Sequence, residues 1–148
     1  MAKKRTKIII DIVMTIFVVL SFVRWDAHNA MFHFIVGTAC AAAFVAHVFV
    51  HRKWVVAVTI SFFTGKIKKK MLGKYLVDLA LLLVWDVSII TGFLAIGYFW
   101  GGVAEMAVFS RIHGVTARVG LALVIVHVIQ HIPQIKSYFK KRGRQNGA

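Results

Sequence analysis

Six of the seven histidines fall into two triplets with the same internal spacing. In each triplet the second histidine follows the first by 14 positions, and the third follows the second by 4. The members of the two triplets are 80 positions apart: His33, His47 and His51 in the first, and His113, His127 and His131 in the second. Repeated imidazoles within apolar sequence are typical of ligands to iron or to another transition metal.

A helix explains the spacing of 14 residues. Fourteen residues make almost four helical turns, with a residual rotation of about 40°, so that His33 and His47 share one face. They are separated along the axis by about 21 Å, which places one near each side of a membrane. If the two helices run parallel, His33 lies level with His113, and two imidazoles can bind one haem iron there. The same applies to His47 and His127.

The third histidines, His51 and His131, lie one turn further along their helices and leave two interpretations open. As ligands in place of His47 and His127, they would stand about 27 Å from the outer pair, which is long for electron transfer. We therefore favour them as groups that hold haem propionates or a quinone head group. The small residues Gly37 and Gly120 lie between the ligands and leave room for a flat macrocycle, although a tight helix pair also favours small residues.

Four long apolar stretches must position these histidines. The chain has 148 residues, of which 59% are hydrophobic and 16% are charged. The stretches cover approximately residues 7–23, 30–50, 74–99 and 112–132, and a membrane helix needs roughly 17–25 residues. The sequence predicts one all-α domain over residues 1–148, an integral membrane four-helix bundle of up-down topology with two haems between the second and fourth helices. Residues 55–63 are too short to span, and either extend the second helix or lie along the interface.

The net charge of +14 is concentrated at the N-terminus, between the second and third stretches, and at the C-terminus. Basic residues beside membrane helices set orientation and attract anionic lipid. Both termini are therefore predicted to be cytoplasmic, with the second and fourth helices parallel, and nucleic acid is not an expected partner. The chain has one cysteine and no C-x-x-C-H motif, so haem would be b-type, without covalent attachment.

Arginines next to the histidines are candidates for holding haem propionates, because guanidinium binds carboxylate in a bidentate manner. Arg24 and Arg111 are predicted for the outer haem, and Arg52 for the inner one.

Other charged residues lie within the apolar stretches themselves. Asp86 and Arg118 are predicted to form a buried ion pair, since an unpaired charge in lipid is costly. A contact of Arg118 with an outer propionate, and a proton path for quinone chemistry, are the alternatives. Asp11 and Asp78 are predicted to pair with nearby lysines.

The first triplet and the residues after it resemble the flavinylation-associated cytochromes. The matching features are the pattern H-x13-H-x3-H with Arg52, Lys53 and Trp54 behind it, the recurring K-x3-D of Lys7/Asp11 and Lys74/Asp78, and Thr91-Gly92. The second triplet keeps the histidines but continues as Ile132-Pro133-Gln134. The resemblance covers nearly the whole chain.

This resemblance implies a four-helix protein with two b haems in the cytoplasmic membrane of a bacterium or archaeon. It implies electron transfer between quinol and an extracytoplasmic partner such as a flavoprotein, with quinol oxidoreductase activity left open. One alternative is a haem-bearing anchor subunit of a dehydrogenase or hydrogenase complex. Another is a histidine-lined metal transporter, although zinc and copper sites usually cluster their ligands at one level.

Overall fold

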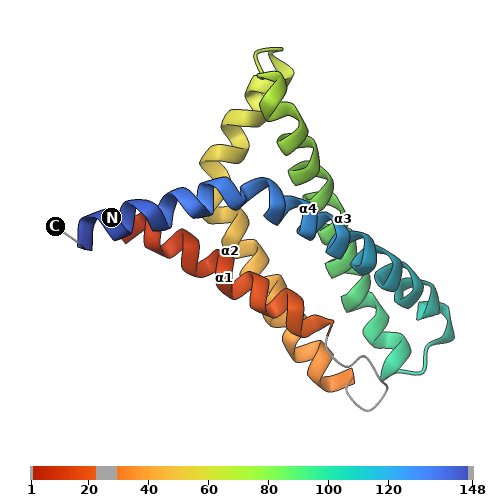
Figure 1. Cartoon of the computed structure of the whole chain (residues 1–148). Coiled ribbons are helices and arrows are strands. Elements are labelled where there is room, and N and C mark those ends of the chain that lie inside the picture. The colour runs from red at the N-terminus through yellow and green to blue at the C-terminus, as the bar shows by residue number, and fades with distance from the viewer. Residues whose placement is uncertain (1, 23–29, 147–148) are drawn as a thin grey trace. The chain divides into compact units, whose positions relative to one another are not determined.

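The structure, a computed structural model, describes residues 2–22 and 30–146. The elements in chain order are α1 (Ala2–Ser21), α2 (Ala30–Phe63), α3 (Lys69–Phe99), the short 3-10 helix η2 (Ala104–Met106) and α4 (Ala107–Asn146) (Figure 1). No strand occurs within the described ranges. The prediction of an all-α fold is confirmed.

The chain divides into two compact units, Met1–Ile67 and Lys68–Ala148. Each unit is a helical hairpin, in which α1 lies along α2 and α3 lies along α4 (Figure 1). The sequence predicts one domain, and the two hairpins are the compact parts of which the chain is made.

The helices extend beyond the apolar stretches that predict them. α2 has 34 residues and α4 has 40, or about 51 and 60 Å, against about 30 Å for the apolar core of a bilayer. Residues 55–63 continue α2, so the first of the two alternatives for this segment holds. α4 continues through Pro133. Both helices continue past residues 50 and 132, where the predicted membrane-spanning stretches end.

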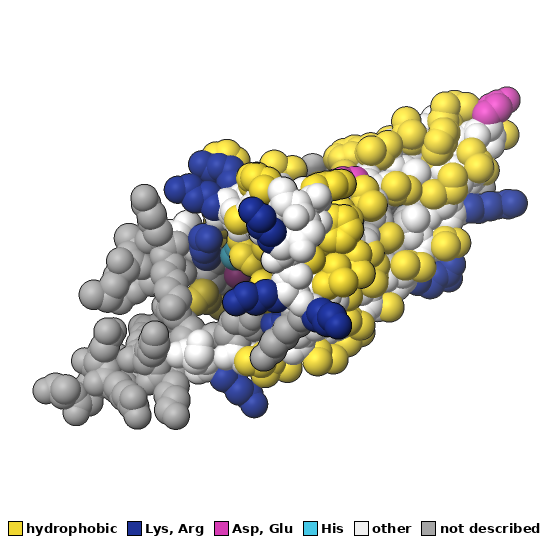
Figure 2. Space-filling view, turned by 90° about the horizontal axis from the view of Figure 1, so that it is seen from above, with side chains coloured by type: hydrophobic (Ala, Val, Ile, Leu, Met, Phe, Trp, Pro, Cys, Tyr) yellow, Lys and Arg dark blue, Asp and Glu magenta, His cyan; other side chains and the backbone are white. Residues whose placement is uncertain are grey.

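Three helical segments are long and apolar enough to cross a membrane: Ala30–Phe63, Met71–Gly97 and Ala104–Ser137. α1 is shorter, with 20 residues, and begins with a basic run. Large hydrophobic side chains are exposed on both units, among them Val45, Ile35 and Ile129. Figure 2 shows hydrophobic side chains over much of the face that is in view. Exposed apolar surface of this extent suits lipid. The chain therefore has the character of a multi-pass membrane protein.

Small residues allow close packing inside each hairpin. A Cβ atom at Gly120 would lie 3.1 Å from Nε1 of Trp85 on α3, so the missing side chain makes room for the indole. The positions that correspond in the first unit, 67 and 80 residues earlier, are Val18 and Cys40, which are 1% and 2% exposed. The second unit thus combines a large and a very small residue where the first has two of intermediate size.

Candidate functional site

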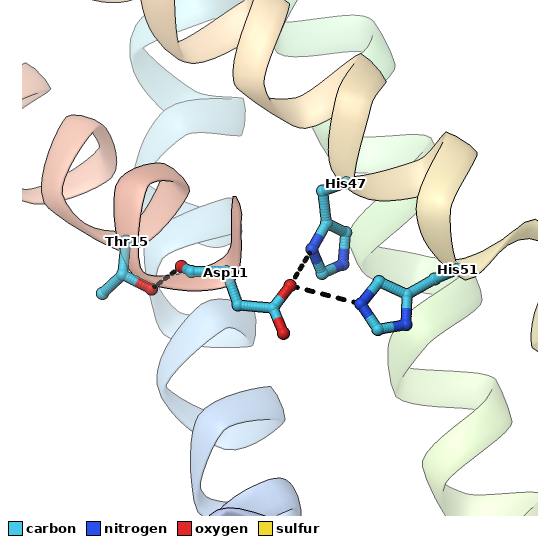
Figure 3. Close-up of polar contacts among 4 residues, drawn as sticks. All are labelled: Asp11, Thr15, His47 and His51. Carbon is cyan, nitrogen blue, oxygen red and sulfur yellow. Dashed lines mark hydrogen bonds and ion pairs between the residues drawn. The ribbon is translucent and has the colours of Figure 1, made fainter. Parts of the chain in front are cut away.

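In the first unit, a carboxylate on α1 meets two histidines of α2. Nδ1–H of His47 donates to Oδ1 of Asp11 at 2.8 Å, and Nε2–H of His51 donates to the same oxygen at 3.2 Å (Figure 3). The side chains of the two histidines are 20% and 28% exposed, and that of Asp11 is 41% exposed. Thr15 donates to the backbone carbonyl of Asp11 at 2.8 Å. This contact involves the backbone of Asp11, whereas the Asp11 carboxylate is directed at the imidazoles.

The second unit repeats this arrangement between α3 and α4. Nδ1–H of His127 donates to Oδ1 of Asp78 at 2.6 Å. Nε2 of His131 lies 3.8 Å from Oδ2 of Asp78, within ion-pair distance but beyond a hydrogen bond. The Asp78 side chain is only 16% exposed, so its carboxylate depends more on the histidine for a polar partner than Asp11 does.

The first histidine of each triplet is held by a backbone carbonyl. Nδ1–H of His33 donates to the carbonyl oxygen of Ser21 at 3.1 Å, and Nδ1–H of His113 donates to that of Ser88 at 2.8 Å. Next to this bond, a Cβ atom at Gly92 would lie 3.0 Å from both Cε1 and Nδ1 of His113. A side chain at position 92 would therefore press against the His113 ring where α3 passes it.

The two units share one polar framework. The acceptors Asp11 and Ser21 recur 67 positions later as Asp78 and Ser88, whereas the histidines recur 80 positions later. In both units the carboxylate holds the second histidine and the serine carbonyl holds the first. The sequence analysis identifies the histidines and the recurring Asp11 and Asp78, but it assigns lysines as the partners of these aspartates. It misses Ser21 and Ser88, which share the same offset of 67 positions.

The acceptors fix which ring nitrogen carries the lone pair. Carboxylate and carbonyl oxygens only accept, so Nδ1 must be the protonated nitrogen of His33, His47, His113 and His127. In the neutral ring, the lone pair is then on Nε2. Metal-bound histidines usually donate the other ring N–H to a carboxylate or a carbonyl, which fixes the ring and its tautomer. These four residues therefore fit the role of axial haem ligands.

The third histidines are held differently. His51 donates to Asp11 through Nε2, so its lone pair lies on Nδ1, the reverse of His47. One ligand atom from each of Asp11, His47 and His51 lies within 4.8 Å of the others, and the same holds for the group of Asp78, His127 and His131. Two histidines and a carboxylate also form a common site for divalent iron and related metals.

The remaining predicted site residues are distributed as follows. Arg24 lies outside the described residues. Arg111 is exposed. Arg52 is also exposed, donates to the carbonyl of Phe49 at 2.9 Å, and lies 3.9 Å from the centre of that ring. A Cβ atom at Gly37 would meet nothing within 4 Å, whereas Gly120 makes room for a tryptophan as described above.

The predicted ion pair between Asp86 and Arg118 is not formed in the second unit. Both side chains are exposed there, and the ion pairs among its described residues are those of Asp78 with histidines. The carboxylates predicted to pair with lysines contact imidazoles instead, and Nζ of Lys74 donates to the carbonyl of Gln130 at 2.9 Å. Imidazoles are the nearer donors because they project from the neighbouring helix at the same level.

No protein-family model, curated protein or solved structure matches this chain. The histidine contacts and their repetition are therefore the observations from which function is inferred. They permit two kinds of metal chemistry: axial ligation of haem through Nε2, and binding of a bare divalent ion by two histidines and a carboxylate.

Proposed function

We propose that this protein is a membrane cytochrome that carries two b-type haems, each bound by two histidines, and transfers electrons across the bilayer. The observation that supports this proposal is the common anchoring of four histidines through Nδ1. Packing alone would not select the same ring nitrogen at two levels in both units. Axial ligation would, because it needs Nε2 available and the ring orientation fixed.

In this proposal, each residue of the framework has a defined part. His33 and His113 bind the outer haem iron through Nε2, while the carbonyls of Ser21 and Ser88 orient their rings. His47 and His127 bind the inner iron in the same way. When bound, haem supplies a one-electron ferric/ferrous couple.

Two aspartates and the third histidines complete the inner level. Asp11 and Asp78 orient the two inner ligands, and His51 and His131 share these carboxylates. A carboxylate shared in this way keeps the third imidazole next to the ligand, in a position suited to a propionate or a quinone head group. Neither third histidine binds iron in this assignment.

The membrane setting and the redox partners belong to the same proposal. All four helices span the bilayer with both termini in the cytoplasm, since the basic residues gather at the termini and after α2. Quinol within the membrane and an extracytoplasmic flavoprotein are the proposed partners, and an anchor subunit of a larger dehydrogenase is the variant of this function in which the partner is permanent. Lipid surrounds the apolar faces.

Spectroscopy and haem analysis of the purified full-length chain test the proposal. We expect about two non-covalent haems per chain, a b-type spectrum after reduction with dithionite, and reduction of part of the haem by quinol. His47→Ala and His127→Ala should each remove the same low-spin, bis-imidazole haem. The double variant should therefore lose no more haem than either single variant. A colourless chain that holds no haem when expressed with sufficient haem supply would refute the proposal.

A second candidate function is the binding or transport of a divalent metal ion, which the two Asp-His-His groups favour. The third histidines distinguish the two candidates. His51→Ala should leave two haems in place if the chain is a cytochrome, whereas it should abolish metal binding in the first unit as completely as His47→Ala if the ion site is the functional one. Metal analysis of the same preparations gives the answer directly.

A further inference from the structure

The two ligand levels differ in the charge of the group that accepts the hydrogen bond from Nδ1. At the inner level the acceptors are carboxylates, with distances of 2.8 Å from His47 to Asp11 and 2.6 Å from His127 to Asp78. At the outer level they are uncharged backbone carbonyls, those of Ser21 and Ser88. This difference occurs in both units, so it belongs to the level and not to one hairpin.

A carboxylate changes the ligand that it holds. A negative acceptor draws the Nδ1 proton and makes the imidazole a stronger electron donor through Nε2, which raises ligand basicity. A more basic and more negative environment favours the ferric over the ferrous state of a haem, and hydrogen bonding to the ligand is among the means by which a protein sets this balance. A carbonyl dipole acts in the same direction but more weakly, because charge-assisted hydrogen bonds are roughly twice as strong as neutral ones.

Among the described residues, the ion pairs of Asp11 and Asp78 are formed with histidines. Nζ of Lys74 donates to the carbonyl of Gln130. The Arg52 guanidinium is exposed and lies over Phe49 of its own helix. In the part of the chain that the structure describes, the side chains within ion-pair distance of the two carboxylates are imidazoles, so the negative charge acts mainly on these rings.

We infer that Asp11 and Asp78 are positioning residues that give the inner ligand pair, His47 and His127, the lower of two midpoint potentials, and that the outer pair has the higher one. This inference rests on the proposed function. Its consequence is an ordering of the two levels: in protein that has taken up a single electron, the electron resides at the outer level, next to the extracytoplasmic side.

Potentiometric titration of the purified full-length protein tests this inference. We expect two components in the wild-type protein. In Asp11→Asn and in Asp78→Asn, the lower component should rise so that the ferrous-to-ferric ratio at a given potential increases at least tenfold, which is 59 mV for a one-electron couple. The higher component should move much less.

Asp86→Asn is the matched control. It removes the same charge from α3, but this side chain is exposed and contacts no histidine among the described residues. It should shift both components by only a small amount. An equal shift in Asp86→Asn and Asp78→Asn would overturn the inference, because the effect would then come from net charge alone.

Variants with one ligand level removed assign the components without any change to the aspartates. His33→Ala retains the inner level and should keep the lower potential, whereas His47→Ala retains the outer level and should keep the higher one. The reverse order, or a shift of the higher component in the Asp11→Asn protein that equals or exceeds that of the lower one, would refute the inference even though haem is bound. Absence of haem from the wild-type chain would instead refute the proposed function.

Discussion

Substitution of Gly92 by alanine should disturb the outer ligand level without touching any histidine directly. The added Cβ atom would lie 3.0 Å from Cε1 and from Nδ1 of His113, at the limit of what real contacts show. The ring cannot simply withdraw, because its Nδ1–H donates to the Ser88 carbonyl at 2.8 Å. Either the contact remains compressed or this hydrogen bond lengthens.

Both routes cost free energy at the same place. Adding a methyl group to a filled site typically costs about 1–3 kcal/mol, and loss of the hydrogen bond costs about 0.5–1.5 kcal/mol. Alanine also gains up to about 1 kcal/mol over glycine in a helix, but this gain acts on α3 as a whole. A penalty of about 1–3 kcal/mol at His113 corresponds to an affinity for the outer haem that is weaker by about 5- to 150-fold.

Titration of haem-depleted protein with haemin measures this affinity, and Gly73→Ala is the control. Gly73 lies on the same helix, and its Cβ atom would meet nothing within 4 Å. It therefore provides the gain in helix stability without the contact. Equal binding of two haems by the Gly92→Ala and Gly73→Ala proteins would show that α3 does not confine the His113 ring, and the geometry described for the outer level would be wrong.

Two further predictions concern stability and accessibility. Asp78→Ala should lower the unfolding temperature in detergent more than Asp11→Ala. The Asp78 side chain is 16% exposed and that of Asp11 is 41% exposed, so the histidine that loses Asp78 is less able to bond water. Equal shifts of the unfolding temperature would contradict the described burial. The thiol of Cys40 is 2% exposed. In the folded protein it should react with a maleimide far more slowly than the thiol of the Thr64→Cys, Cys40→Ser variant, because Thr64 is exposed. The two rates should be equal after denaturation in SDS, and similar rates before denaturation would contradict the burial of Cys40.

The histidine faces could be predicted from the sequence because they depend only on the helical period. His33 and His47 belong to one helix, so a separation of 14 residues fixes their relative direction without knowledge of any neighbour. The apolar length of α2 and α3 is likewise a property of each segment taken alone. These features required no information about packing.

The acceptors could not be predicted in the same way, because they depend on how two helices pair. Asp11 and Ser21 are 10 residues apart on α1, about 15 Å, whereas the histidines that they hold are 14 residues apart on α2, about 21 Å. No constant register relates the two helices at these points. This difference of about 6 Å along the axis is bridged because the acceptors differ in length. At one level the acceptor is a carboxylate at the end of a side chain, and at the other it is a backbone carbonyl.

Asp86 and Arg118 show a second limit of the same kind. Similar depth in the membrane suggests an ion pair, but contact also requires that the two side chains point toward one another. Both are exposed on the hairpin formed by α3 and α4. Since a charged side chain facing lipid is costly, the faces that carry these two residues are expected to turn toward protein, water or a bound group.

The duplication of the framework separates the two proposed chemistries by the number of ligands each requires. One hairpin offers one Nδ1-anchored imidazole at each level. The proposed bis-imidazole haem needs two, so under this proposal each unit would supply one ligand and a lesion in either unit would remove the same haem. An Asp-His-His group, by contrast, is complete within one hairpin, so an ion site in the other unit would survive the lesion. The non-additive loss expected of His47→Ala and His127→Ala therefore follows from the cytochrome proposal, and a purely additive loss belongs to the metal-ion alternative.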